Sequence, residues 1–128
     1  MKIVIITGES LEDIDKAYDK LDKYQCTNGM LEFPEVYCHP KVFCEDVVRM
    51  IKFSQLASNP IIIKTFSNAI VNLIGIMISK GYIDNNDVVV DYTYKGEQRN
   101  TSYDKKGYIK DWKVGFFSHD RIDELWEK

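Results

Sequence analysis

The stretch that decides the fold is IIIKTFSNAIVNLIGIMISKG, at residues 61–81. It begins with Ile61–Ile63, a continuous β-branched run of the kind found in parallel strands that are covered on both faces. Ser67–Lys80 follows and is apolar on most sides of a helix, which is typical of a helix buried by a sheet or by a partner. Gly81 suits the position just after the last helical turn. The stretch therefore predicts one strand–helix unit of a parallel sheet.

Two more strand–helix units are expected upstream of this stretch. They are strand Lys2–Ile6 with helix Ser10–Lys23, and strand Met30–Phe33 with a helix that begins near Pro40 and ends at Asn59-Pro60. Ser10 is a suitable N-cap, and Pro34 is expected to end the second strand because proline cannot donate to a strand ladder. The alternation of strands and helices predicts a mostly parallel sheet flanked by helices.

Downstream of residue 81 the pattern changes from helix to strand. Asp87–Tyr94 reads as a strand, Lys95–Glu97 as a hairpin turn, and Arg99–Tyr103 as the returning strand. Lys105–Gly107 is a further turn. We therefore predict one α/β domain over residues 1–128, with an antiparallel β element towards its C-terminal end.

Composition narrows the range of functions. The chain has 128 residues, 45% of them hydrophobic and 29% charged, which fits one globular domain. A net charge of -3 argues against a nucleic-acid binder that relies on a basic face. The apolar run Ile3–Ile6 is too short for a signal peptide, and Ala69–Ile78 is too short to span a bilayer. We expect a cytoplasmic protein without a membrane partner.

The cysteines raise the question of a metal site. Cys26, Cys38 and Cys44 are odd in number, which suits reduced thiols. Together with His39 they could bind zinc, but their spacing fits no common zinc pattern, and buried structural thiols are the preferred interpretation. Glu32 and Glu35 could be the remains of a metal site or part of a solvated loop, and the loop is preferred. We expect no metal and no cofactor.

Three segments together resemble one family. MLEFPEVYCHP at residues 30–40 is similar to the Walker B strand and D-loop of ABC-type ATPases of the OLD-like and related bacterial defence groups. IIIKTFSN at residues 61–68 is similar to the next strand and switch-histidine loop of those ATPases, and the match continues through the helix to Asp87-Val88. GYIKDWKVGFF at residues 107–117 resembles their C-terminal signature Gly-x-Ile-x-Asp-Trp-Pro-x-Gly-Phe-Phe, with Lys113 in place of proline. The turn Thr7–Ser10 lies at roughly the spacing of the ABC signature loop.

The resemblance implies a set of corresponding positions. Glu32, Phe33, Pro34 and Glu35 correspond to Walker B and the D-loop, and Thr65, Phe66 and Ser67 to the switch loop. The C-terminal signature is carried by Gly107, Asp111, Trp112, Gly115, Phe116 and Phe117. The implied fold is similar to the rear lobe of an ABC-type ATPase head.

The departures from the family concern its catalytic groups. No phosphate-binding G-x-x-x-x-G-K-[ST] loop occurs in the sequence. Phe33 stands where a water-polarising carboxylate is often found, and Phe66 stands at the switch-histidine position. A phenyl ring can neither accept a proton nor hydrogen-bond a phosphate. We therefore expect no catalytic residues, no enzymatic activity and no nucleotide binding by the chain alone.

The expected function is protein–protein interaction. A half-head that lacks the phosphate-binding loop could dock on a full-length ABC-type ATPase as a decoy or regulator, and the composition is compatible with a phage or mobile-element origin. Two alternatives stay open. One is a self-associating structural module, and the other is a subunit of an enzyme assembled in trans, with Glu32 supplying a metal ligand.

The aromatic residues towards the C-terminal end allow two interpretations. Trp112, Phe116 and Phe117 could form a partner patch, but a tail folded back onto the core is preferred. Three tyrosines near Lys95 and Arg99 could stack single-stranded nucleic acid, although alternating tyrosines are ordinary strand composition. These three are Tyr92, Tyr94 and Tyr103.

Overall fold

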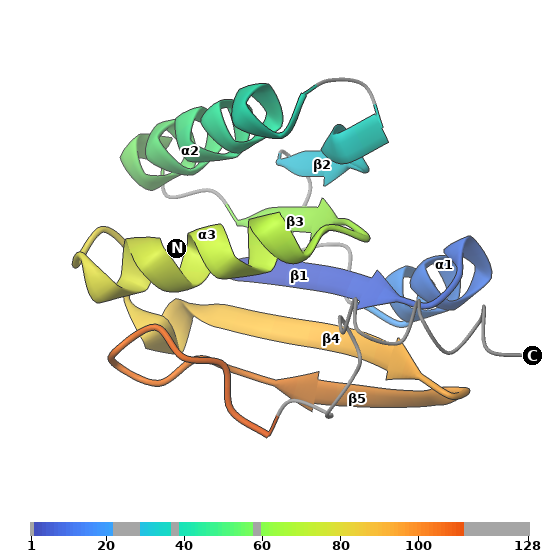
Figure 1. The fold of residues 1–128 in the computed structure, drawn as a ribbon. Helices are drawn as coiled ribbons and strands as arrows, with labels where there is room; N and C mark the ends of the chain where they lie inside the picture. The colour runs from blue at the N-terminus through green and yellow to red at the C-terminus, as the bar shows by residue number, and fades with distance from the viewer. Residues whose placement is uncertain (1, 22–28, 37–38, 58–59, 112–128) are drawn as a thin grey trace, which may run out of the picture.

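The computed structural model describes residues 2–21, 29–36, 39–57 and 60–111. In chain order the elements are β1 (Ile3–Gly8), α1 (Leu11–Asp19), β2 (Met30–Glu32), the 3-10 turn η2 (Pro34–Val36), α2 (Pro40–Ala57), β3 (Ile61–Lys64), α3 (Asn68–Ser79), the 3-10 turn η3 (Asn85–Asp87), β4 (Val88–Tyr94) and β5 (Glu97–Thr101) (Figure 1). The strands and helices predicted up to residue 103 are all present, but several of them have other bounds. α1 ends at Asp19 and not at Lys23, β2 ends before Phe33, and β5 spans Glu97–Thr101 and not Arg99–Tyr103. The sequence also predicts a short charged helix from about Asp120 to Glu127, and this segment lies outside the described residues.

The five strands form one sheet in the order β2-β3-β1-β4-β5. β1 pairs in parallel with both β3 and β4, so that Ile3 lies beside Ile61 on one side and Val88 on the other. β2 pairs in parallel with β3, and only β5 is antiparallel, against β4. The predicted α/β class, mostly parallel with an antiparallel element near the end, is therefore confirmed. The central place of the first strand was not predicted from the sequence.

Helices cover both faces of this sheet. The connection from β1 to β2 runs across the sheet in one direction, whereas those from β2 to β3 and from β3 to β4 run in the other. Parallel crossovers of one handedness then place α1 on one face and α2 with α3 on the opposite face (Figure 1). The described helices include none long and apolar enough to cross a membrane.

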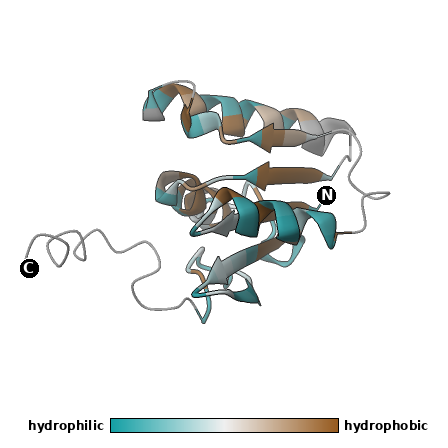
Figure 2. Ribbon diagram, turned by 90° about the vertical axis from the view of Figure 1, so that its right-hand side faces the viewer, coloured by the Kyte–Doolittle hydropathy of each residue, from teal (hydrophilic) through white to brown (hydrophobic). Residues whose placement is uncertain are grey.

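The hydrophobic core is split by the sheet into two layers. Alternate residues of β1 point to opposite faces, so Ile3 and Ile5 pack under α2 and α3, while Val4 and Ile6 pack under α1. The first layer also receives Phe43, Val47 and Ile51 from α2 and Ile70, Val71, Ile74, Met77 and Ile78 from α3. Figure 2 shows the central strands as strongly hydrophobic and the helices as mixed.

Local signals in the sequence define the ends of several elements. The Ser10 side chain accepts a hydrogen bond from the Asp13 backbone N–H at 3.2 Å and so caps α1 as predicted. The β4–β5 hairpin turns at Lys95 and Gly96, which have φ angles of 51° and 79°. Positive φ at both central residues defines a type I′ turn, whose twist suits a two-residue hairpin.

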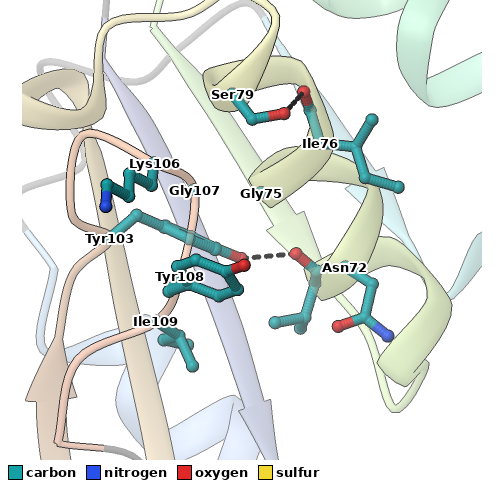
Figure 3. Close-up of a pocket in the computed structure, with 10 residues that line it drawn as sticks. Asn72, Gly75, Ile76, Ser79, Tyr103, Lys106, Gly107, Tyr108 and Ile109 are labelled. Atoms are coloured by element: carbon teal, nitrogen blue, oxygen red, sulfur yellow. Dashed lines mark hydrogen bonds between the residues drawn. The ribbon is translucent and has the colours of Figure 1, made fainter.

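A close backbone contact fixes the segment after β5. Gly107, at φ 87°, lies against Gly75 of α3 so tightly that a Cβ atom on either residue would overlap the carbonyl of the other. Beside this contact the Tyr103 hydroxyl donates to the Val71 carbonyl oxygen at 2.6 Å, and Tyr103 pairs with Ile109 as an isolated β-bridge. Figure 3 shows this segment packed along α3.

Candidate functional site at the carboxyl ends of the parallel strands

The topology marks one place on the sheet as a candidate site. β1 and β3 are neighbours, but the chain leaves β1 for α1 on one face and leaves β3 for α3 on the other. In open α/β sheets, ligands bind outside the carboxyl ends of the strands at such a point. Because β2 lies next to β3, this edge brings together the two predicted segments Glu32–Glu35 and Thr65–Ser67.

Glu35 joins these two segments. Its Oε1 accepts hydrogen bonds from the Thr65 hydroxyl at 2.8 Å and from the Phe66 backbone N–H at 2.6 Å. The Thr65 hydroxyl oxygen in turn accepts from the Ser67 backbone N–H at 2.9 Å. The second oxygen of Glu35 is buried without a partner among the described residues, and Pro34 beside it is buried as well. The preferred interpretation of a solvated loop is therefore wrong for Glu35, whose hydrogen bonds join the two loops. We call these bonds the Glu35 tie.

Glu32 is paired with a buried cation. The Lys64 side chain is only 7% exposed, and its Nζ lies 3.2 Å from Glu32 Oε1 and 3.9 Å from Asp15 Oδ1. The same Nζ lies 3.9 Å from the centre of the Tyr18 ring, within the range of a cation–π contact. A metal ion at Glu32 would have to compete with this amino group for the carboxylate.

Phe33 and Phe66, the two phenylalanines that the resemblance aligns with catalytic positions, stack on one another. The Phe33 and Phe66 ring centres are 5.0 Å apart, with 23° between the ring planes. Phe33 also packs against the α1-side core, whereas Phe66 is 40% exposed and Val36 nearby in sequence is 68% exposed. The replacement of two polar groups by phenylalanine predicts from the sequence that both positions are packed rather than solvated. This is confirmed for Phe33, which is partly buried, and is wrong for Phe66. We call Phe33, Val36 and Phe66 the aromatic edge.

Phe33 also has an unusual backbone. Its φ angle is 48°, a left-handed conformation that costs a bulky residue about 1–2 kcal/mol. Its N–H donates to the Lys64 carbonyl at 2.8 Å, and its own carbonyl accepts from the Val36 N–H at 3.0 Å. Strained residues persist where their surroundings over-determine them. The position of the Phe33 ring is thus held by backbone bonds on both sides.

The turn Thr7–Ser10 lies at the same edge, where it joins β1 to α1. The Thr65 N–H donates to the Ile6 carbonyl at 3.0 Å, which places this turn beside the switch-like segment. A strand–turn–helix arrangement is the setting of a phosphate-binding loop. Here, however, Glu9 accepts a hydrogen bond from the Lys95 backbone N–H, and residues 7–13 contain three acids and no basic residue. Such a turn repels an anion.

The described part of the C-terminal signature has structural contacts. Gly107 makes the close approach to α3, and the Asp111 carbonyl accepts from the Tyr92 hydroxyl at 3.4 Å. Trp112, Gly115, Phe116 and Phe117 lie outside the described residues. Tyr92 and Tyr103 are buried. They cannot join Tyr94 in a stacking surface for nucleic acid, which leaves ordinary strand composition as the interpretation.

The candidate metal ligands do not gather in the part of the chain that the structure describes. No group of three or more histidine, cysteine or acidic residues that could hold a metal ion occurs there. His39 Nδ1 accepts from the Lys41 backbone N–H at 3.2 Å, and Cys44 is half-buried on α2, where desolvation raises the pKa of its thiol. Cys26 and Cys38 lie outside the described residues.

Comparison with protein-family models, curated proteins and solved structures finds no match to this chain. The resemblance to ABC-type ATPases is thus carried by the quoted residues alone. The buried contacts of Lys64 were missed in the sequence, where a lysine after three isoleucines reads as the solvated end of a strand. The ion pair could be identified from the β2–β3 register, which sets Lys64 beside Glu32. That register is known only once β2 and β3 are known to be neighbours.

Proposed function

We propose that this protein is a non-catalytic relative of ABC-type ATPase heads that acts by binding another protein, and that its partner is a full-length ABC-type ATPase. The observation that carries the proposal is the aromatic edge. At the carboxyl ends of the parallel strands, where a nucleotide site would need polar groups, two stacked phenyl rings stand instead.

Both glutamates at this edge are engaged by neighbouring groups. Glu32 is paired with Lys64, and Glu35 is bound by Thr65 and the Phe66 backbone. Phosphoryl transfer depends on cationic groups and a bound metal that stabilise the phosphate charge. The acidic turn after β1 offers neither. These features favour a protein without ATPase activity.

The same edge has the properties of a docking surface. Phe66 and Val36 are exposed apolar side chains, and the Glu35 tie fixes the backbone beneath Phe66. Aromatic side chains held in place before association lose little entropy on binding and often dominate the energy of an interface. A decoy or regulator of a defence ATPase, carried by a phage or mobile element, would use such a surface to occupy the face of the ATPase.

A capture experiment tests this proposal. The tagged protein is incubated with lysate of its native host, and bound proteins are identified by mass spectrometry. We expect a protein with a P-loop and an ABC signature to be retained, and Phe66→Ser to reduce its recovery at least about tenfold, as for an interface hot spot. The control is Phe53→Ser, because Phe53 is 69% exposed and lies near the end of α2, in the groove beside Leu31 and Met50.

Two results would contradict the proposal. One is the absence of any P-loop ATPase from the retained proteins. The other is equal recovery of that ATPase by Phe66→Ser and by the unaltered protein. Addition of the purified protein to the captured ATPase should also change its rate of ATP hydrolysis, since a regulator must act on the activity of its target.

A further inference from the structure

A second surface lies at the end of the sheet away from β5, where α2 and β2 stand together (Figure 1). β2 is the edge strand among the described residues. The Gly29 carbonyl accepts from the Ile62 N–H, and the Phe33 N–H donates to the Lys64 carbonyl. Amide groups alternate in direction along a strand, so those of Met30 and Glu32 point away from β3. The structure therefore presents a strand edge with four backbone hydrogen-bonding groups directed outward.

Apolar side chains accompany this edge. A groove of about 400 Å³ runs between β2 and α2 and is lined by Leu31, Asp46, Arg49, Met50 and Phe53. Phe53 is 69% exposed, and Met30 on the edge strand is exposed too. An open strand edge with exposed apolar side chains beside it is a site for pairing with another chain.

The charges on the groove are self-complementary. Asp46 and Arg49 lie about one turn apart on α2, with the Arg49 Nη1 3.0 Å from Asp46 Oδ1, and their side chains are 44% and 75% exposed. Leu31 of β2 lines the same groove as these two residues. A two-fold axis through Leu31 would bring Arg49 of each copy opposite Asp46 of the other. The charges of the groove are therefore complementary to those of the same groove on a second copy.

We propose that this surface is a two-fold interface between two copies of this chain. β2 pairs antiparallel with β2 of the second copy, with Leu31 on the axis. Met30 and Glu32 of each copy then exchange backbone hydrogen bonds with Glu32 and Met30 of the other, four bonds in all. The two sheets become one, and the two edges are closed against further growth.

The helices supply the contact area that a short strand lacks. β2 has only three residues, and strands of that length are marginal without side-chain packing. α2 has 18 residues and is about 27 Å long at 1.5 Å per residue. In the two-fold arrangement both α2 helices lie on the same face and run antiparallel, with exposed Phe53 near exposed Val42 of the second copy.

Light scattering coupled to size exclusion tests the interface. The unaltered protein should be a dimer at micromolar concentration, and Phe53→Glu should be a monomer with an unchanged circular-dichroism spectrum. Arg49→Asp should raise the dimer dissociation constant at least about tenfold, because it opposes like charges twice across the axis. The double variant Asp46→Arg, Arg49→Asp should restore the dimer, since it exchanges the charges and keeps their pairing.

A protein that is monomeric across the micromolar range would overturn this inference, as would a double variant as weak as Arg49→Asp alone. The inference is independent of the proposed ATPase partner. Phe66→Ser should leave the dimer intact while it reduces capture of the ATPase, and Phe53→Glu should disrupt the dimer while it leaves capture unchanged. Loss of both properties in both variants would show that the two surfaces are one and would contradict the two-fold model.

Discussion

At the scale of single residues, Tyr103 is one of the largest fully buried side chains among the described residues. Burial raises the pKa of its phenol far above its usual value, so the hydroxyl keeps its proton throughout the working range of pH. It can therefore act as a permanent donor to the Val71 carbonyl in α3. The hydrogen bond ties the segment after β5 to the helix.

Tyr103→Phe should lower the free energy of unfolding by about 1 kcal/mol, since it removes one hydrogen bond and opens no large cavity. Urea denaturation followed by circular dichroism measures the change. Tyr108→Phe serves as the control because Tyr108 is exposed, and it should have no measurable effect. Equal effects of the two substitutions would argue against a structural role for the Tyr103 hydroxyl.

Glu35 is the second residue with a specific prediction. Glu35→Ala removes the acceptor of two hydrogen bonds, one from Thr65 and one from the Phe66 backbone. Bonds to a charged group contribute more than neutral ones, so the expected loss is about 2–4 kcal/mol. Thermal denaturation measures it, with Glu45→Ala on the exposed face of α2 as the control. A loss no greater than that of the control would show that the tie between the two loops is not formed.

Asp91 predicts how stability depends on pH. It is buried in β4, and this desolvation raises the pKa of its carboxyl, partly opposed by the charge of Lys2. The folded state therefore holds the Asp91 proton to higher pH than the unfolded state. The destabilising contribution is fully present above the raised pKa, and it disappears as pH falls through that value towards the usual aspartate range.

Asp91→Asn should accordingly stabilise the fold at neutral pH and should lose this benefit in acid. The new side-chain amide would remain beside Asn100, the partner of this position on β5. Chemical denaturation at a series of pH values measures both effects. A variant that is less stable than the unaltered protein at neutral pH would show that the carboxylate is stabilised by contacts that outweigh its desolvation.

At the scale of elements, the contact between α3 and the segment after β5 depends on two glycines. Gly107→Ala would place a methyl group against the Gly75 carbonyl and would also strain a positive φ. Gly96→Ala imposes the same kind of backbone strain with open space around the new methyl. We expect Gly107→Ala to lower the free energy of unfolding by about 1–3 kcal/mol more than Gly96→Ala, which is the usual cost of overpacking. Similar thermal stabilities of the two variants would contradict the close approach.

The elements themselves could largely be predicted from the sequence. The triple isoleucine of β3, the serine cap of α1 and the glycine after α3 are local signals, and each is confirmed. The order of the strands could not be predicted, because it depends on pairings between residues far apart in the chain. β1 looks like any other buried strand, and nothing local to it shows that it takes two partners.

At the scale of the whole molecule, the segments of the candidate site could be predicted from the sequence, whereas their contacts could not. The segments around Glu32 and Phe66 were selected by resemblance, and their mutual contact follows from β2 and β3 being neighbours. The buried lysine and the stacked rings depend on side-chain placement across that junction, which periodicity does not encode. The sequence thus identified the residues of this edge, but not the ion pair between Glu32 and Lys64 or the stacking of the two rings.

The pairing of Glu32 with Lys64 gives a prediction about nucleotide binding by the whole molecule. Millimolar ATP with magnesium should leave the melting temperature unchanged, because a ligand stabilises a fold only if it binds the folded state. Differential scanning fluorimetry measures this, with magnesium alone as the reference. An increase specific to ATP that disappears in Glu32→Ala would contradict a non-catalytic role and would favour an enzyme assembled in trans.

The central place of β1 has a consequence for how the protein is made in the cell. β1 leaves the ribosome before its partners β3 and β4, which begin at Ile61 and Val88, much later in the chain. At a synthesis rate of about 5–20 residues per second, β1, whose six residues are all buried in the folded protein, waits several seconds for its neighbours. During translation the nascent chain therefore exposes an isoleucine-rich, aggregation-prone strand. Chaperones that shield such strands should raise the yield of folded protein.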